Sequence, residues 1–98
     1  DIKIMIMEPF VLPGCNTVNI EKDPDRLNGF KKSVFQYSGI AKQVADDYNL
    51  EFVPLQQKLN EAAKIMGDEQ ILADGVHPTA IGHEIIAREW IKHFKEIE

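Results

Sequence analysis

Apolar residues are concentrated in two short segments of the chain. Residues 2–7 are nearly all apolar, and residues 50–55 form a second run that contains Pro54 near its end. Short apolar runs of this kind are typical of strands that are buried on both faces of a parallel sheet. The sequence therefore predicts strands at 2–7 and 50–55.

Three longer segments repeat their apolar residues at steps of three and four, which is the spacing of one helix face. They predict helices over 24–48, 55–66 and 79–97, with Asp23 as N-cap and Pro24 as first residue of the first helix. The stripe in the first helix spans too few heptads for a coiled-coil seam. The expected inward residues are Leu27, Phe30, Val34, Tyr37, Ala41, Val44 and Tyr48, then Leu55, Leu59, Ala62, Ala63 and Met66, then Ile81, Ile85, Ile86, Trp90, Ile91 and Phe94.

The predicted order is strand, helix, strand, helix, loop and helix, with the loop over 68–78. A strand–helix–strand crossover implies parallel strands joined by a right-handed connection. The order predicts an α/β fold, of which this chain carries about two strands and three helices. Because two strands cannot form a sheet that is buried on both faces, we expect further strands from sequence before Asp1 or from a partner.

Length and charge restrict the class of protein. A chain of 98 residues is one domain at most. Its net charge of −5 disfavours contact with phosphate backbones, so we expect no nucleic-acid partner. No apolar run reaches the length of about 18 residues that a transmembrane helix needs, so we expect no transmembrane segment.

The start of the chain and its cysteine content do not determine the cellular compartment. The sequence begins with Asp1 and shows no signal region, so we expect a chain that was processed or is part of something longer. The single Cys15 excludes an internal disulfide. These features fit a cytoplasmic protein or a secreted bacterial protein without disulfide bridges.

The candidate chemistry lies in the loop, where Asp74 precedes His77 by three residues and Pro78 follows. At this spacing the carboxylate can accept a hydrogen bond from imidazole Nδ1, fix the tautomer and leave Nε2 free to take a proton from a nucleophile. The plainer alternative is a surface Asp–His pair in a turn before a helix.

A nucleophile is not evident, because the sequence contains no Gly-Asp-Ser and no Gly-x-Ser-x-Gly turn. Ser33 and Ser38 fall within the long predicted helix, where no strained turn exposes them. Cys15 follows the first predicted strand, and a Cys–His–Asp triad is chemically sound. A lone loop cysteine is, however, more often incidental.

Other polar residues permit weaker hypotheses. A metal site would need Asp74, His77, His83 and Glu84 to converge, which their spacing does not favour, so we expect no metal ion. His93 is most simply interpreted as a cation near the C-terminal end of a helix. Glu8 and Phe10 follow a buried strand and either line a substrate cleft or, in the case of Phe10, anchor a loop in the core.

The motif Asp74-x-x-His77-Pro78, followed by Thr79-Ala80-x-Gly82-His83 and an amphipathic helix, resembles the C-terminal motif of the SGNH/GDSL hydrolases. These are serine esterases and acylhydrolases, including lipases, lysophospholipases and carbohydrate acetylesterases. The segment from Ile4 to Phe10 is similar to a later strand and loop of that family. The resemblance implies a three-layer α/β/α (flavodoxin-like) fold, with Asp74 as triad acid, His77 as triad base and no metal or organic cofactor.

The same resemblance implies that 1–98 is the C-terminal part of one SGNH-hydrolase-like domain. The N-terminal part, with the serine, glycine and asparagine motifs, is absent from this sequence. We therefore expect the full-length protein to hydrolyse short acyl or acetyl esters of lipids or carbohydrates, and this chain alone to be inactive. Its expected partners are a small ester substrate and the missing half or another copy of the chain, with self-association. The alternative is a non-catalytic α/β module.

Overall fold

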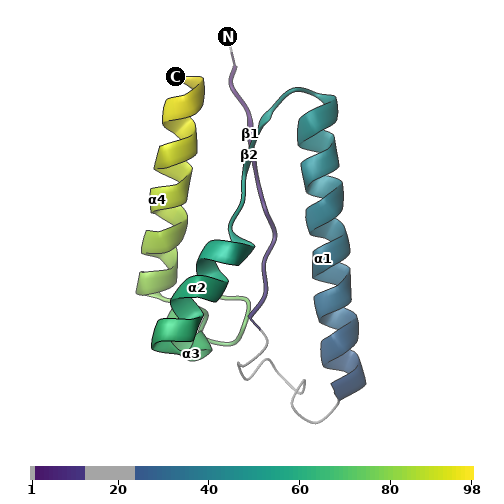
Figure 1. The fold of residues 1–98 in the computed structure, drawn as a ribbon, viewed down its shortest axis with the longest axis vertical. Coiled ribbons are helices and arrows are strands. Elements are labelled where there is room, and N and C mark those ends of the chain that lie inside the picture. The colour runs from purple at the N-terminus through teal and green to yellow at the C-terminus, as the bar shows by residue number, and fades with distance from the viewer. Residues whose placement is uncertain (1, 13–23) are drawn as a thin grey trace.

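The structure is a computed structural model that describes residues 2–12 and 24–98, with the side chains of 2–12 and 29–98. Two strands and four helices follow one another along the chain (Figure 1). They are β1 (Met5–Met7), α1 (Pro24–Asp47), β2 (Glu51–Val53), α2 (Gln56–Met66), α3 (Asp68–Ile71) and α4 (Ala80–Ile97).

The two strands pair in parallel, as the crossover predicts, with Met5 opposite Glu51 and Met7 opposite Val53. Each strand has three residues, fewer than predicted. The pairing cannot extend toward the N-terminus, because the residues before β2 form the turn that ends α1, where Asn49 has a φ of 56°. Pro54 follows β2 directly and lacks the N–H that a longer ladder requires.

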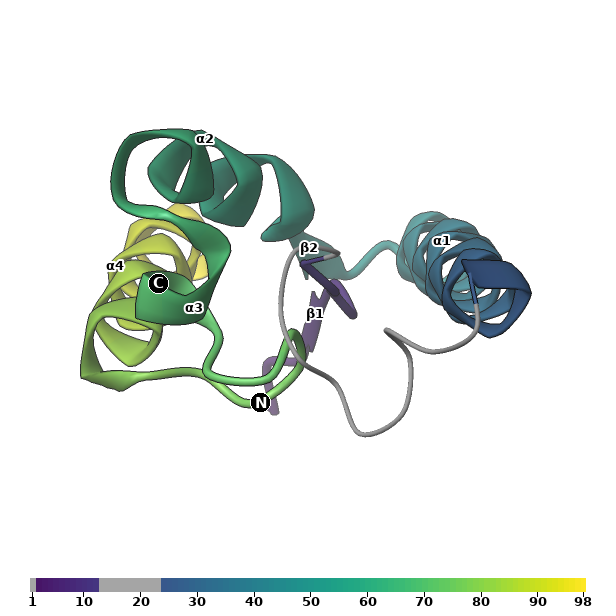
Figure 2. The same cartoon turned by 90° about the horizontal axis from the view of Figure 1, so that it is seen from below.

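The helices lie on both sides of the strands, which gives a partial three-layer α/β/α arrangement. Figures 1 and 2 show α1 on one side and α2, α3 and α4 on the other. The hydrophobic core occupies the second side. Its buried residues are Leu12, Val53, Leu55, Leu59, Ala63, Ile71 and Leu72, against which Met5, Phe10, Ala62, Ile81, Ile85 and Ile86 pack.

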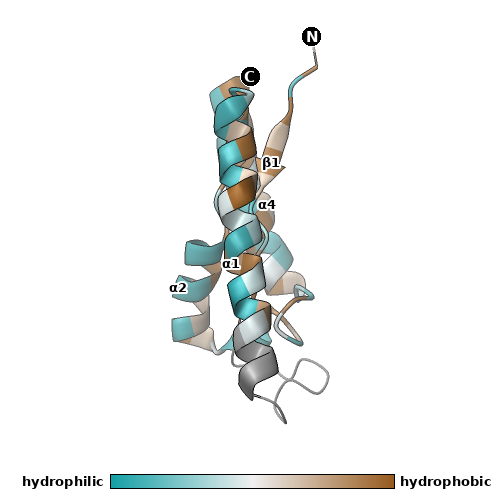
Figure 3. Ribbon diagram, turned by 90° about the vertical axis from the view of Figure 1, so that its right-hand side faces the viewer, coloured by the Kyte–Doolittle hydropathy of each residue, from teal (hydrophilic) through white to brown (hydrophobic). Residues whose placement is uncertain are grey.

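The predicted inward face of α1 is largely uncovered. Tyr37 is 63% exposed and Tyr48 is 74% exposed, whereas the neighbouring Ala45 is fully buried. Phe35 and Ile40 are also exposed, and apolar segments recur along the described part of α1 in Figure 3. Two strands form too narrow a surface to cover a helix of 24 residues. The predictions for Leu27, and for Asp23 as N-cap, concern parts of the chain that the structure does not describe.

The other helices differ from prediction at their ends. Met66 is exposed rather than inward, since α2 stops there and Gly67 turns the chain with a φ of 92°. The loop predicted over 68–78 begins with α3 instead, because burial of Ile71 and Leu72 holds this stretch against α2. The first half of α4 packs on the core, but Trp90, Ile91 and Phe94 are partly exposed, with the two aromatic rings stacked at 5.1 Å. No helix in the described part is long and apolar enough to cross a membrane.

Candidate active site

The Asp74–His77 loop joins α3 to α4 and is closed by its own backbone. Leu72 and Pro78 form an isolated antiparallel bridge, and the Ala73 N–H donates to the His77 carbonyl at 2.8 Å. Gly75 has a φ of 95°, a conformation that L side chains rarely adopt. Glycine at this position therefore permits the tight turn between the acid and the histidine.

The carboxylate of Asp74 organises the loop through both of its oxygens. Oδ2 lies 2.5 Å from His77 Nδ1. Oδ1 accepts the backbone N–H groups of Val76 at 3.0 Å and His77 at 2.8 Å. These contacts stabilise the charged form and lower the pKa of Asp74 from 3.8 to about 2, chiefly through the backbone N–H of His77, then that of Val76 and the His77 side chain. Asp74 is therefore an anion at neutral pH.

The histidine is oriented by this carboxylate and open on its other edge. Its side chain is 79% exposed, whereas that of Asp74 is 32% exposed. With Nδ1 turned toward Asp74, Nε2 is left for an outside partner. Because a carboxylate only accepts hydrogen bonds, the contact requires a hydrogen on Nδ1, and a general base needs this orientation of the ring. The contact agrees with the arrangement predicted from the spacing of the two residues.

The first turn of α4 holds the C-terminal end of the Asp74–His77 loop in place. Thr79 is the N-cap, and its Oγ1 accepts the N–H of Gly82 at 3.1 Å. The same hydroxyl lies 2.7 Å from the carbonyl oxygen of Gln70 and 3.0 Å from that of Ile71. Gly82 is so close to α3 that an added Cβ would lie 2.2 Å from the Ile71 oxygen. The first turn of α4 is thereby locked onto the end of α3.

The loop lies at the carboxyl end of the strands (Figure 1). The N–H of Leu12, beyond the end of β1, donates to the Gly75 carbonyl at 3.0 Å. Ligands of open α/β sheets bind outside the carboxyl ends of the strands. The pair is therefore on the side of the sheet where such sites occur.

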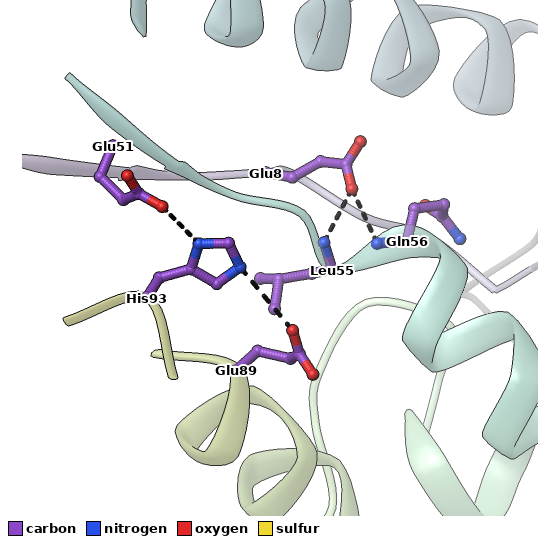
Figure 4. Close-up of polar contacts among 6 residues, drawn as sticks. All are labelled: Glu8, Glu51, Leu55, Gln56, Glu89 and His93. Carbon is purple, nitrogen blue, oxygen red and sulfur yellow. Dashed lines mark hydrogen bonds and ion pairs between the residues drawn. The ribbon is translucent and has the colours of Figure 1, made fainter. Parts of the chain in front are cut away.

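Glu8 has a structural role that the sequence did not reveal. Its Oε1 accepts the N–H groups of Leu55 and Gln56, both at 2.8 Å, at the N-terminus of α2 (Figure 4). Its Oε2 accepts the hydroxyl hydrogen of Ser38 from α1. Glu8 thus caps α2 and connects it to β1 and α1. It also lines a pocket of about 390 Å³, whereas Phe10 packs on the core.

His93 lies near the C-terminal end of α4, and its side chain makes contacts that were not predicted from the sequence. Its Nδ1 lies 2.6 Å from Glu51 Oε1, and its Nε2 lies 3.9 Å from Glu89 Oε2 (Figure 4). The side chain is only 18% exposed. His93 therefore ties α4 to β2. The sequence did not show this, since Glu51 is 42 positions away.

The candidate metal ligands that the structure describes do not gather around the Asp74–His77 pair. Glu84 pairs with Arg88 at 2.8 Å on the exposed side of α4. Among the residues that the structure describes, no group of three or more His, Cys, Asp or Glu side chains is placed to hold a metal ion. Ser33 is exposed on α1, and Cys15 lies outside the described residues.

Comparison with known proteins supports a hydrolase relationship. No protein-family model matches the sequence. The chain is 34% identical over 89 residues to an acetylxylan esterase from Geobacillus stearothermophilus, a match that covers 91% of the chain and 36% of that protein.

Solved structures give the same result. Two catalytic mutants of an acetylxylan esterase from G. stearothermophilus, one with an aspartate and one with a serine replaced by alanine, superpose with TM-scores of 0.72 and 0.70 at 31% and 32% identity. A protein described as a GDSL-like lipase from Parabacteroides merdae superposes with a TM-score of 0.69 at 27% identity. Each match covers 93% of this chain and 37% or 38% of the other.

These matches confirm the resemblance that the Asp74–His77 motif indicates. The chain is related to the SGNH/GDSL-type hydrolases and has part of their α/β fold. It spans little more than a third of the length of the relatives it matches.

Proposed function

We propose that this chain supplies the acid and the base of a catalytic triad in an SGNH/GDSL-type serine ester hydrolase. The observation that carries the proposal is the 2.5 Å contact between Asp74 Oδ2 and His77 Nδ1 on a loop at the carboxyl end of a parallel sheet. The low pKa of Asp74 supports it, because the orienting carboxylate must remain charged while the imidazole gains a proton.

In this proposal the nucleophilic serine lies in sequence beyond this chain. The serine oxygen attacks the ester carbonyl while His77 Nε2 takes its proton. His77 then gives that proton to the departing alcohol, and an acyl-enzyme remains. Water attacks the acyl-enzyme with His77 again as base, which releases the acid and restores the serine. Asp74 holds the ring in place and stabilises the imidazolium at each stage.

We propose further that residues 1–98 are the C-terminal part of a single domain whose remainder carries the serine, glycine and asparagine motifs. The uncovered apolar residues of α1 and the two-stranded sheet support this arrangement. The acetylxylan esterase match favours acetyl or other short acyl esters as substrates. Without the remainder, the exposed apolar surface favours self-association of the chain.

The test is hydrolysis of an aryl acetate by the longer protein that contains both this chain and the nucleophilic serine. We expect His77→Ala to lower kcat/KM by about 10⁴-fold or more, because the members of a triad act as one unit. His83→Ala is the matched control, since His83 is exposed on α4 near the loop, and we expect it to keep wild-type turnover. The 98-residue chain alone should show no turnover.

Two results would contradict the proposal. One is turnover of His77→Ala within about tenfold of wild type. The other is failure of a fluorophosphonate probe to label the protein that contains the nucleophile, which would favour a non-catalytic module.

A further inference from the structure

The segment that follows β1 is held by a side chain of α2 that acts as a strand partner. The Val11 N–H donates to Gln56 Oε1 at 3.0 Å, and Gln56 Nε2 donates to the Val11 carbonyl at 2.8 Å. One primary amide thus satisfies both backbone polar groups of a buried residue. Because such groups are costly to leave unpaired, Gln56 determines where this segment runs.

The position of Gln56 is itself fixed by hydrogen bonds to other residues. Its backbone N–H donates to Glu8 Oε1 at 2.8 Å, which places it in the first turn of α2 (Figure 4). Its Nε2 also donates to Asn60 Oδ1, one turn further along α2, at 3.0 Å. The backbone contact does not depend on the Gln56 side chain, so α2 keeps its cap when that side chain is changed.

The next residue along the chain connects this anchor to the Asp74–His77 loop. Leu12 is buried in the core, and its N–H donates to the Gly75 carbonyl at 3.0 Å. Gly75 lies between Asp74 and Val76, whose N–H is held by Asp74 Oδ1. A shift of Leu12 therefore moves the turn in which the carboxylate sits.

We propose that Gln56 is a positioning residue for the Asp74–His77 pair, acting through Val11, Leu12 and the Gly75 carbonyl. The inference rests on the proposed function, since it concerns the same acid–base pair. Thr79 and Gly82 fasten the loop from the side of α4. Gln56 fastens it from the side of the sheet, through residues that are far away in the sequence.

The test compares Gln56→Met and Gln56→Glu with Gln57→Met. Methionine keeps the length of the side chain and removes both hydrogen bonds to Val11, whereas glutamate keeps an acceptor for the Val11 N–H and removes the donor. Gln57 is the matched control, because it is exposed and its amide contacts only Glu61 among the hydrogen bonds described. The readouts are amide exchange at Leu12, the His77 Nδ1 proton resonance, and kcat and KM in the protein that contains the nucleophile.

For Gln56→Met we expect amide exchange at Leu12 to accelerate by about tenfold or more and the His77 Nδ1 resonance to shift or broaden. We expect kcat to fall by about tenfold or more with KM within about twofold, as misplacement of a catalytic group predicts. Gln56→Glu should show smaller changes, and Gln57→Met none.

Wild-type exchange at Leu12 together with an unchanged His77 resonance in Gln56→Met would overturn the inference. Unfolding of both Gln56 variants, seen by circular dichroism, would also overturn it, since Gln56 would then serve stability and not position. Absence of ester turnover in the wild-type protein would refute the proposed function instead, while exchange and resonance would still decide the role of Gln56.

Discussion

The effect of Gly82→Ala on stability can be estimated from the contacts that the added methyl group would make. A Cβ there would lie 2.2 Å from the Ile71 oxygen and 3.2 Å from Pro78 Cβ. Ordinary contacts between heavy atoms are about 3.5–4.0 Å, so α4 would have to move away from α3 by more than roughly 1 Å. The Ile71 oxygen belongs to the backbone and accepts the Thr79 N–H at 3.0 Å, so it cannot rotate aside as a side chain would.

Three contributions, two unfavourable and one favourable, decide the change in stability of Gly82→Ala. Overpacking costs about 1–3 kcal/mol, and the weakened contact between Thr79 and Ile71 costs about 0.5–1.5 kcal/mol more. Alanine in a helix is favoured over glycine by about 0.8–1.0 kcal/mol. We therefore expect the free energy of unfolding to fall by about 2 kcal/mol, within a range of about 0.5–3.7 kcal/mol.

The assay is urea denaturation of Gly82→Ala beside Gly39→Ala. Gly39 lies within α1, and beyond its chain neighbours and the backbone of its own helix, no atom of the described residues lies within 4 Å of an added Cβ. The same substitution there therefore retains only the helix-propensity gain. We expect Gly39→Ala to be more stable than wild type by up to about 1 kcal/mol. If Gly82→Ala were as stable as Gly39→Ala, the close packing of α4 on α3 would be refuted.

Two further predictions concern carboxylates. Asp74 should titrate at about 2 in carbon NMR, so its contribution to stability is complete above its ordinary pKa of 3.8 and is lost as pH falls through about 2; titration near 3.8 would contradict its hydrogen bonds. Glu8→Ala should lower the free energy of unfolding by about 0.5–2 kcal/mol, because Leu55 and Gln56 lose their cap. The exposed Glu61→Ala is its control, and equal stability of the two variants would contradict the capping role.

The sequence predicted features that depend on neighbouring residues. Short apolar runs place β1 and β2, and apolar positions at steps of three and four place three of the helices, since each element buries one face or two. The Asp74–His77 contact was predictable for the same reason, because both residues belong to one short loop. The end of α2 was predictable as well, from Gly67.

Features that depend on tertiary contacts were not predictable from the sequence alone. The contacts of Glu8 with Leu55 and of His93 with Glu51 join residues more than 40 positions apart, and nothing in the local pattern marks them. The exposed residues of α1 show the converse. Tyr37 and Val44 have the spacing of a buried face, but the two strands that the structure describes do not cover them.

The short range of the Asp74–His77 contacts has a consequence for how an active site can be assembled. Both oxygens of Asp74 bind groups no more than three residues away. The orientation of the imidazole is therefore set by the loop and does not depend on the presence of the nucleophile. A site whose dipoles are already aligned needs little reorganisation when charge develops. In the proposed hydrolase, the serine-bearing part would have only to bring its hydroxyl within reach of a His77 side chain that is already oriented.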